Sequence, residues 1–349
     1  MTADDTGGSL PLALTMGDPA GIGGEITLLA WRNRLPSTPA FFVIDDPDRL
    51  SALVRLLDLD ITVRPVESAA EALDVFPGAL PVLPQPLDCS VSPGAPDERA
   101  ATAVLGSIDQ AISLVVRGEA AAMVTNPIHK ATLLSAGFGH PGHTEYIAEI
   151  TGASGPPVMM LACPQLRVVL TSIHVPLRDA IAALCEDSIV HCCRVAAAAL
   201  ARDFGIRSPR LAIAGLNPHA GERGYLGREE IEIVAPAIAQ LHQDGLSVSG
   251  PLPADTMFHE RARCEYDAAV CLYHDQALIP IKTLDFDGGV NITLGIPIVR
   301  TSPDHGTAFD IAGTGKASPR SLLAALTEAR RMADNRARYD AASTAPALV

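Results

Sequence analysis

Short apolar runs that end at polar residues recur along this chain. The clearest run extends from Ala268 to Tyr273 and stops at the polar triplet His274-Asp275-Gln276. Similar runs elsewhere end at Asp18, at Asn126, at His174, and at Asn217 with His219. In an open α/β sheet, ligands bind just beyond the carboxyl ends of the strands. The pattern therefore predicts strands that deliver polar side chains to one edge of a sheet.

Segments with helical periodicity alternate with these apolar runs. We expect strands at 11–16, 40–46, 120–125, 157–162, 167–173, 210–215 and 268–273, and helices at 24–34, 98–118, 187–204, 227–243 and 319–335. A further helix should begin near Thr144, and Asp255 should lie on a loop. This alternation is typical of an α/β fold with a mostly parallel sheet. The glycines of GDPAGIGGE do not fit G-x-G-x-x-G, because residue 26 is Ile, so a Rossmann fingerprint is absent.

Composition narrows the class of protein. The 349 residues are 48% hydrophobic, which indicates two domains or one large α/β unit, and the net charge of −14 argues against nucleic acid or an anionic membrane as partner. No apolar run approaches the length of a membrane span. The seven cysteines form no C-x-x-C pair, so we expect a reducing cytoplasm. Residues 1–9 are expected to be a disordered lead-in and residues 336–349 a frayed tail.

Three of the ten histidines, His174, His219 and His274, directly follow apolar runs. Three imidazoles from separate strand ends are the protein ligands of an open catalytic zinc site. The alternative is that each is an isolated histidine bonded to the backbone. Asp255 and Asp275 are candidates either to orient a histidine or to join the metal shell.

A second set of residues suits the recognition of anions. We expect these residues in loop-like positions, where they can hold a phosphate and a carboxylate: His143, Thr144, Lys282, Asn291 and Arg300. For Arg300 alone, a surface ion pair is the alternative. Lysine is otherwise scarce, since the chain has only Lys130, Lys282 and Lys316, and we expect none of them on a helix surface.

The segment SPDHGTAFDIAGTGKASP is rich in glycine and precedes the last helix. It is not a P-loop, because residue 310 is Asp rather than Gly and Lys316 is followed by Ala. Its composition still allows the backbone to approach a nucleotide closely.

Several motifs together resemble one enzyme family. They are TMGDPAGIG, TNPIHK, GHPGHTEYIAE, HVPLRD, GLNPHAGE, PLPADTMFH, YHDQALIPIK and NITLGIPIVRTSPDHGTAFDIAGTG. In this order, over about residues 10–335, they resemble the 4-hydroxythreonine-4-phosphate dehydrogenases of pyridoxal-phosphate (vitamin B6) biosynthesis. HGTAFDIAGTGKASP is also similar to the cofactor loop of isocitrate and isopropylmalate dehydrogenases.

The resemblance implies a two-domain α/β/α sandwich of the isocitrate dehydrogenase type, with the active cleft between the domains. The cofactor-side domain would comprise 10–125 plus 300–335, and the metal, substrate and dimerisation domain 126–299. It also implies a cytoplasmic homodimer in which both subunits supply histidines to a divalent metal, with zinc, magnesium and cobalt as candidates. NAD or NADP would lie along 303–318, near these residues: Asp304, His305, Gly306, Gly313 and Gly315.

The resemblance further implies the reaction. The expected activity is oxidation of 4-phosphooxy-L-threonine at C3 to 2-amino-3-oxo-4-phosphooxybutanoate, which loses CO₂ to give 3-amino-2-oxopropyl phosphate. Lys282, Asp255 and Asp275 are the candidate bases. Three alternatives remain: a dehydrogenase of D-threonate or D-erythronate 4-phosphate, a hydrolase with a three-histidine metal site, and a phosphate acyltransferase.

Overall fold

The computed structural model describes residues 10–140 and 142–344, so the expected lead-in at 1–9 and the residues after 344 lie outside the described part. The chain forms two compact units. Unit 1 contains the chain up to Thr151 and Pro297–Arg330, and unit 2 contains Gly152–Ile296 and the chain from Arg331. Residues 126–151, which include His143 and Thr144, therefore belong to unit 1.

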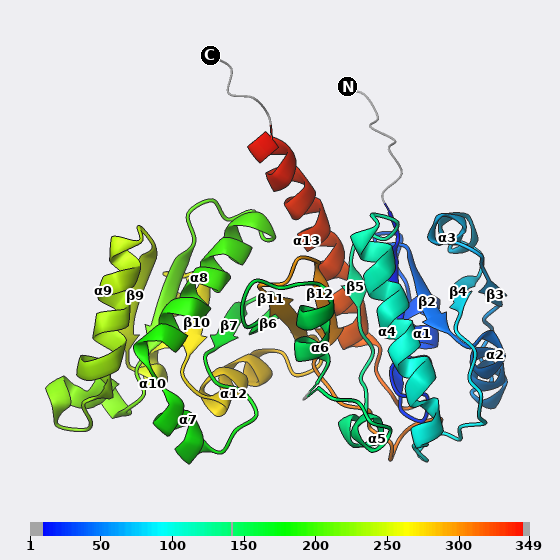
Figure 1. The fold of residues 1–349 in the computed structure, drawn as a ribbon, viewed down its shortest axis with the longest axis horizontal. Helices are drawn as coiled ribbons and strands as arrows, with labels where there is room; N and C mark the ends of the chain where they lie inside the picture. Colours follow the sequence, from blue (N-terminus) through cyan, green and yellow to red (C-terminus); the bar gives the residue numbers. More distant parts are fainter. Residues whose placement is uncertain (1–9, 141, 345–349) are drawn as a thin grey trace. The chain divides into compact units, whose positions relative to one another are not determined.

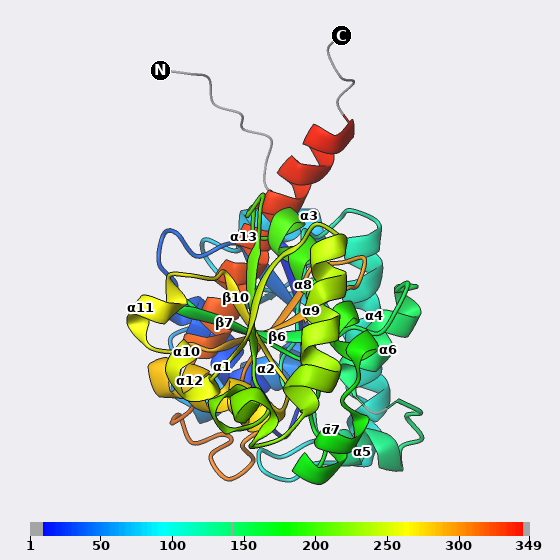
Figure 2. The same ribbon diagram turned by 90° about the vertical axis from the view of Figure 1, so that its left-hand side faces the viewer.

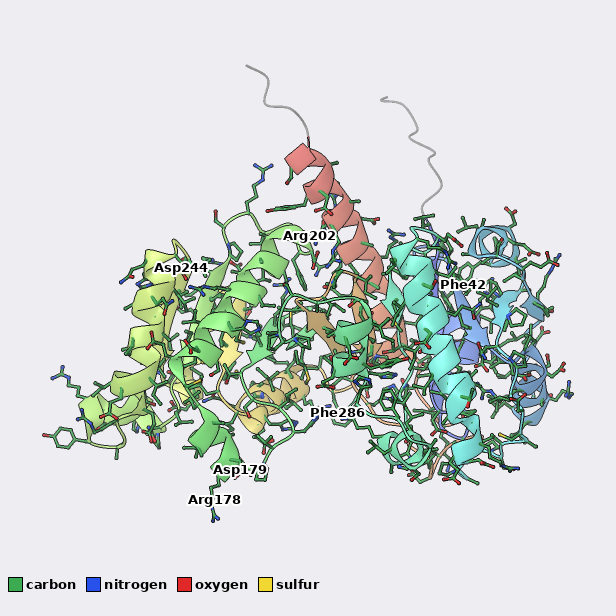
Figure 3. All side chains as sticks on the ribbon, in the orientation of Figure 1. Phe42, Arg178, Asp179, Arg202, Asp244 and Phe286 are labelled. Atoms are coloured by element: carbon green, nitrogen blue, oxygen red, sulfur yellow. The ribbon has the colours of Figure 1, made fainter. Side chains whose placement is uncertain are left out.

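Unit 1 is built on a parallel sheet with the strand order β3-β4-β2-β1-β5-β12. Its strands are β1 (Leu12–Thr15), β2 (Phe41–Asp45), β3 (Val63–Pro65), β4 (Leu80–Pro84), β5 (Met123–Val124) and β12 (Arg300–Pro303). Every residue of β1 and β2 is buried, including Phe42 (Figure 3), which explains why these strands read as continuous apolar runs.

Helices cover this sheet and connect its strands. They are α1 (Gly23–Arg32), α2 (Pro47–Leu56), α3 (Ala69–Val75), α4 (Ala101–Val116), α5 (Lys130–Ser135) and α6 (His143–Ile150), with the short turn η1 (Glu98–Ala100) before α4. Asp46 begins α2 by accepting the backbone N–H groups of Asp48 and Arg49, and Pro47 occupies the first helical position. In Figure 1, α4 lies along one face of the strands of unit 1.

One stretch of the described residues, Glu98–Val116, is long and apolar enough to cross a membrane by length and composition alone. Half of this stretch is buried, and α4 packs against β1, β2 and β5. These contacts account for its apolar character as that of a core helix.

Unit 2 contains a mixed sheet with the strand order β11-β6-β7-β10-β8-β9. Its strands are β6 (Val158–Cys163), β7 (Leu166–Leu170), β8 (Arg210–Ala214), β9 (Ser247–Leu252), β10 (Ala268–Cys271) and β11 (Val290–Leu294). The β6–β7 and β6–β11 pairs are antiparallel, and the pairs that join β7, β10, β8 and β9 are parallel. The prediction of a mixed α/β fold with mostly parallel pairing is confirmed.

Helices lie on both faces of the strands of unit 2. Figure 2 shows α8 (Glu186–Arg202) and α9 (Ala235–Gln243) on one side of the strands, and α11 (Glu260–Arg263) and α12 (His274–Leu284) on the other. The remaining elements are α7 (Leu177–Ala183), η2 (Pro218–Gly224), η3 (Glu230–Val234) and α10 (Ala254–Met257). Asp244, which is labelled in Figure 3, directly follows α9. Its carboxylate forms an ion pair with Arg194 of α8, and this pair joins the two helices.

Several expectations about local structure are wrong, and one of them concerns Lys130, which was expected away from any helix surface and instead is the exposed first residue of α5. Asp255 lies in the first turn of α10 rather than on a loop, and Lys282 lies on α12. Asn291 and Arg300 lie within β11 and β12. The last helix, α13 (Arg320–Thr344), continues through most of the expected tail because Asp203 and Arg202 of unit 2 bind Arg336 and Asp340.

Candidate functional site

Unit 1 brings three of the predicted anion-binding residues to the start of α6. The helix begins at His143, as predicted, with Gly142 at its N-cap and Thr144 as its second residue. Arg300 opens β12 and is buried, and its Nε and Nη2 donate to Thr125 Oγ1 at 3.1 and 2.6 Å. Burial lowers the pKa of Arg300 to about 10, against a smaller opposing effect of Glu145, so the guanidinium stays protonated at neutral pH.

The ring of His143 has the properties of a ligand-facing group. Its Nε2 is buried and has no hydrogen-bond partner in the described chain. Burial, together with the charges of Arg300 and Lys130, holds the pKa of His143 well below its usual value of 6.5, so the ring is neutral. A neutral ring with an unpaired buried nitrogen beside helix N–H groups fits a bound oxyanion.

Sequence interpretation did not assign Lys130 to this place. A Cβ added at Gly142 would lie 3.3 Å from Lys130 Nζ, so the ammonium lies directly beside the N-terminus of α6. The signal was present in the sequence, because lysine occurs at three positions only. We call the group formed by His143, Thr144, Arg300 and Lys130 the anion corner.

Unit 2 brings together two of the three predicted metal ligands. The ring centroids of His174 and His274 are 5.8 Å apart, and both residues line a pocket of about 280 Å³. His274 is the first residue of α12, and its Nδ1 lies 2.7 Å from Asp275 Oδ1. This contact engages Nδ1 and leaves Nε2 as the nitrogen that could bind a ligand, and a carboxylate behind a histidine is the usual support of a metal-bound imidazole. The pair therefore fits a divalent cation.

His219 does not join this pair. Among residues 10–140 and 142–344, no three His, Cys, Asp or Glu side chains lie close enough to hold one metal ion. His219 lies in a turn in which residues 219–223 all have positive φ, between 42° and 77°. Left-handed backbone is unfavourable for residues with a Cβ, so other contacts must hold this turn.

The candidate bases and the other substrate residues are spread over unit 2. Asp275 lies in the first turn of α12 and Lys282 in its last, where the Nζ of Lys282 is 5.4 Å from the centre of the exposed Phe286 ring (Figure 3). Asp255 lies on α10, and Asn291 lies on β11 with its Nδ2 3.7 Å from Met159 Sδ. The geometry of unit 2 does not rank the three bases.

The glycine-rich segment in unit 1 packs against the start of α1. Asp304 N–H donates to Ser321 Oγ at 3.0 Å, and His305 Nδ1 lies 3.1 Å from the carbonyl oxygen of Gly306. Gly313 and Gly315 have φ values of +73° and +75°, which residues with a Cβ rarely adopt. A pocket of about 580 Å³ borders this segment and is lined by residues that include Gly21, Glu25, Arg49, Leu53 and Gly313.

These features define an α/β protein with an anion corner in one unit and a histidine pair in the other. Residues 37–329 match the family model described as the pyridoxal phosphate biosynthetic protein PdxA, and the chain belongs to this family.

Similarity to individual proteins extends over nearly the whole chain. The chain is 54% identical over 335 residues to the 4-hydroxythreonine-4-phosphate dehydrogenase of Bradyrhizobium diazoefficiens, with 93% of this chain and 97% of that protein covered. A crystal structure of the enzyme of that name from Klebsiella pneumoniae has a TM-score of 0.84 and 38% identity, covering 93% and 100% of the two chains. A terephthalate 1,2-cis-dihydrodiol dehydrogenase from Burkholderia xenovorans has a TM-score of 0.62 and 28% identity, covering 93% and 98%.

Proposed function

We propose that this protein oxidises 4-phosphooxy-L-threonine at C3, using NAD or NADP and a divalent metal, in pyridoxine 5′-phosphate biosynthesis. The relatives at 54% and 38% identity both carry the name of this dehydrogenase. The observation in the structure that carries the proposal is the anion corner. There a neutral His143 with a buried Nε2, a protonated Arg300 and Lys130 surround the N-terminus of a helix.

The anion corner binds the phosphate in this proposal. The helix N–H groups and the His143 ring donate hydrogen bonds to phosphate oxygens, while Arg300 and Lys130 supply charge. Lys282 and Asn291 complete the predicted substrate contacts. Binding at these positions holds C3 in one orientation, which is a large part of what an enzyme contributes to a bond-breaking step.

In this proposal, a side chain of the protein removes the proton of the C3 hydroxyl. Lys282, Asp255 and Asp275 are the candidates to take the proton of the C3 hydroxyl. A divalent cation bound by His174, His219 and His274 would lower the pKa of that hydroxyl, and the nicotinamide along 303–318 would accept the hydride. The product has a carboxylate β to its new carbonyl, so it loses CO₂ readily.

The architecture that we propose is two-domain and of the isocitrate dehydrogenase type, without a Rossmann fold. In the division by function that we propose, the cofactor side comprises 10–125 plus 300–335 and the substrate and metal side comprises 126–299, so residues 126–151 serve substrate binding although they pack in unit 1. We further propose a cytoplasmic homodimer in which both subunits supply ligands to each metal.

The test is the formation of reduced nicotinamide with 4-phosphooxy-L-threonine or D-threonate 4-phosphate, each with and without a chelator. Chelator-sensitive turnover that prefers the amino acid supports the proposal. Turnover with D-threonate 4-phosphate only would support the same oxidation reaction with a different substrate. Absence of turnover with both, in protein loaded with metal, would reject the dehydrogenase in favour of a metal hydrolase.

A further inference from the structure

Glu25 is a fully buried carboxylate that binds the glycine-rich segment. It lies in the first turn of α1 and has no exposed surface. Its Oε2 accepts the backbone N–H of Gly313 at 2.9 Å, and its Oε1 accepts the backbone N–H of Ala317 at 3.1 Å. One side chain therefore holds two points of the segment, four residues apart, although about 290 residues of chain separate them from Glu25.

The arginine that lines the same pocket as Glu25 donates hydrogen bonds to other residues. Arg49, which lines the same pocket, donates from Nε to Asp45 Oδ1 at 3.0 Å and from Nη1 to the carbonyl oxygen of Pro19 at 3.2 Å. The backbone of the segment adds one further contact, because Ile22 N–H donates to the carbonyl oxygen of Thr307 at 3.0 Å. The segment is thus fixed to the start of α1 at three points, and Glu25 supplies two of them.

A carboxylate is the side chain that this arrangement requires. Glutamate offers two acceptor oxygens to two N–H donors, whereas glutamine offers one acceptor and one NH₂ group. In Glu25→Gln, one backbone N–H would face another donor in a buried place. The segment must then move away from α1 or leave that N–H unpaired, which is costly in the interior of a protein.

We propose that Glu25 is a positioning residue for the dinucleotide: it holds 313–317 in the conformation that binds NAD or NADP. The inference rests on the proposed function, because the cofactor role of 303–318 does. Glu25 itself is buried behind the segment and acts through the backbone of Gly313 and Ala317. It is therefore expected to set the affinity for the cofactor and to leave the chemical step unchanged.

Glu25→Gln and Glu25→Ala test the proposal in the metal-loaded, full-length protein. Trp31→Phe is the matched control, because Trp31 lies on the same helix and its buried Nε1 donates to the Phe76 carbonyl oxygen at 3.0 Å, away from the segment. We expect the KM for the dinucleotide to rise roughly tenfold in Glu25→Gln and further in Glu25→Ala. The kcat at saturating cofactor should stay within about twofold, and the KM for the phosphorylated substrate should be unchanged.

Amide hydrogen exchange without cofactor provides a second readout. Exchange at 311–318 should become faster in Glu25→Gln and not in Trp31→Phe. An unchanged KM for the dinucleotide in Glu25→Gln, or an equal rise in Trp31→Phe, overturns the inference. If wild-type protein forms no reduced nicotinamide at all, the proposed function has failed and the cofactor role of Glu25 with it. In that case, faster exchange in Glu25→Gln would show only that Glu25 anchors the segment, without a role in cofactor binding.

Discussion

Glu230 accepts two hydrogen bonds from Asn217, one from its backbone N–H at 2.7 Å and one from its side-chain Nδ2 at 2.9 Å. Glu230 is buried, and its carboxylate also lies against Gly221, where an added Cβ would come within 2.6 Å of Oε2. These contacts hold the left-handed turn that carries His219 at the residue that precedes it by two positions, Asn217, and at its middle residue, Gly221. The pair explains how a strained backbone persists at a candidate metal ligand.

Glu230→Ala should therefore destabilise unit 2. We expect the free energy of unfolding to fall by about 1.5–3 kcal/mol, because the backbone N–H of Asn217 loses its charged acceptor, whereas Asn217 Nδ2 keeps its bond to Glu229 Oε2 at 2.7 Å. Chemical denaturation measures this change. Glu232→Ala is the control. Glu232 is exposed and forms a surface ion pair with Arg228, so its replacement should cost about 0–1 kcal/mol. Equal losses in the two variants would contradict the bracing role.

Asp275→Asn should weaken metal binding without unfolding the protein. Asp275 contacts His274 Nδ1 at 2.7 Å, and loss of such an orienting carboxylate typically reduces metal affinity about 10- to 100-fold. Calorimetric titration of metal-free protein with Zn²⁺ measures the affinity directly. Asp244→Asn removes an acidic group of unit 2 that pairs with Arg194, and it should leave the affinity unchanged. An unchanged affinity in Asp275→Asn would argue against His274 as a ligand.

Arg300→Lys should impair substrate binding although it keeps the charge. The planar guanidinium donates twice to Thr125 Oγ1, and a lysine ammonium cannot reproduce this geometry. We expect the KM for the phosphorylated substrate to rise about tenfold or more, by analogy with the loss of a charged hydrogen bond. Arg336→Lys is the matched control, because it changes a second well-buried arginine that pairs with Asp203 in unit 2. It should lower stability and leave the KM unchanged.

His143 predicts how stability depends on pH. The folded protein holds the pKa of His143 well below 6.5, whereas the unfolded chain takes up a proton near 6.5. The unfolded state thus binds more protons as pH falls below 6.5, and the folded state loses stability until the lower folded pKa is reached. Thermal unfolding from about pH 7.5 to about pH 5 should show a steeper loss for wild type than for His143→Gln. Parallel curves would show that His143 contributes nothing to this dependence.

Sequence patterns predicted the elements that depend on local information. A buried parallel strand such as Phe41–Asp45 is apolar up to its last residue, and a capped start such as that of α2 depends on adjacent residues. The start of α6 at His143 was also predictable from neighbouring residues. The placement of His174 beside His274 follows from the parallel pairing of β7 with β10, which brings the ends of these strands together.

The features that sequence interpretation missed depend on contacts between distant segments. Glu25 reads as an ordinary acidic residue in a first helical turn, and only the fold brings Ala317 to it. Lys282 was expected in a loop-like segment after the strand at 268–273, yet α12 begins at His274 and continues through Pro280 to Leu284. The left-handed turn at 219–223 contains a single glycine, Gly221, so the local sequence does not predict a left-handed backbone there.

The length of the C-terminal helix α13 also depends on contacts with a distant segment, and these contacts can be tested by mutation. The Asp203 carboxylate accepts the Arg336 Nε and Nη2 at 2.7 and 2.8 Å, and the Arg336 and Asp203 side chains are 15% and 5% exposed, whereas those of Arg202 and Asp340 are 39% and 46% exposed. Asp203→Ala should lower the free energy of unfolding by about 3 kcal/mol, because it removes the carboxylate that neutralises a largely buried guanidinium. Asp340→Ala should cost only about 0–1 kcal/mol. Chemical denaturation of both variants distinguishes them, and hydrogen exchange at 331–344 should increase more in Asp203→Ala. If Asp340→Ala had the larger effect, the exposed pair rather than the buried one would hold this helix in place.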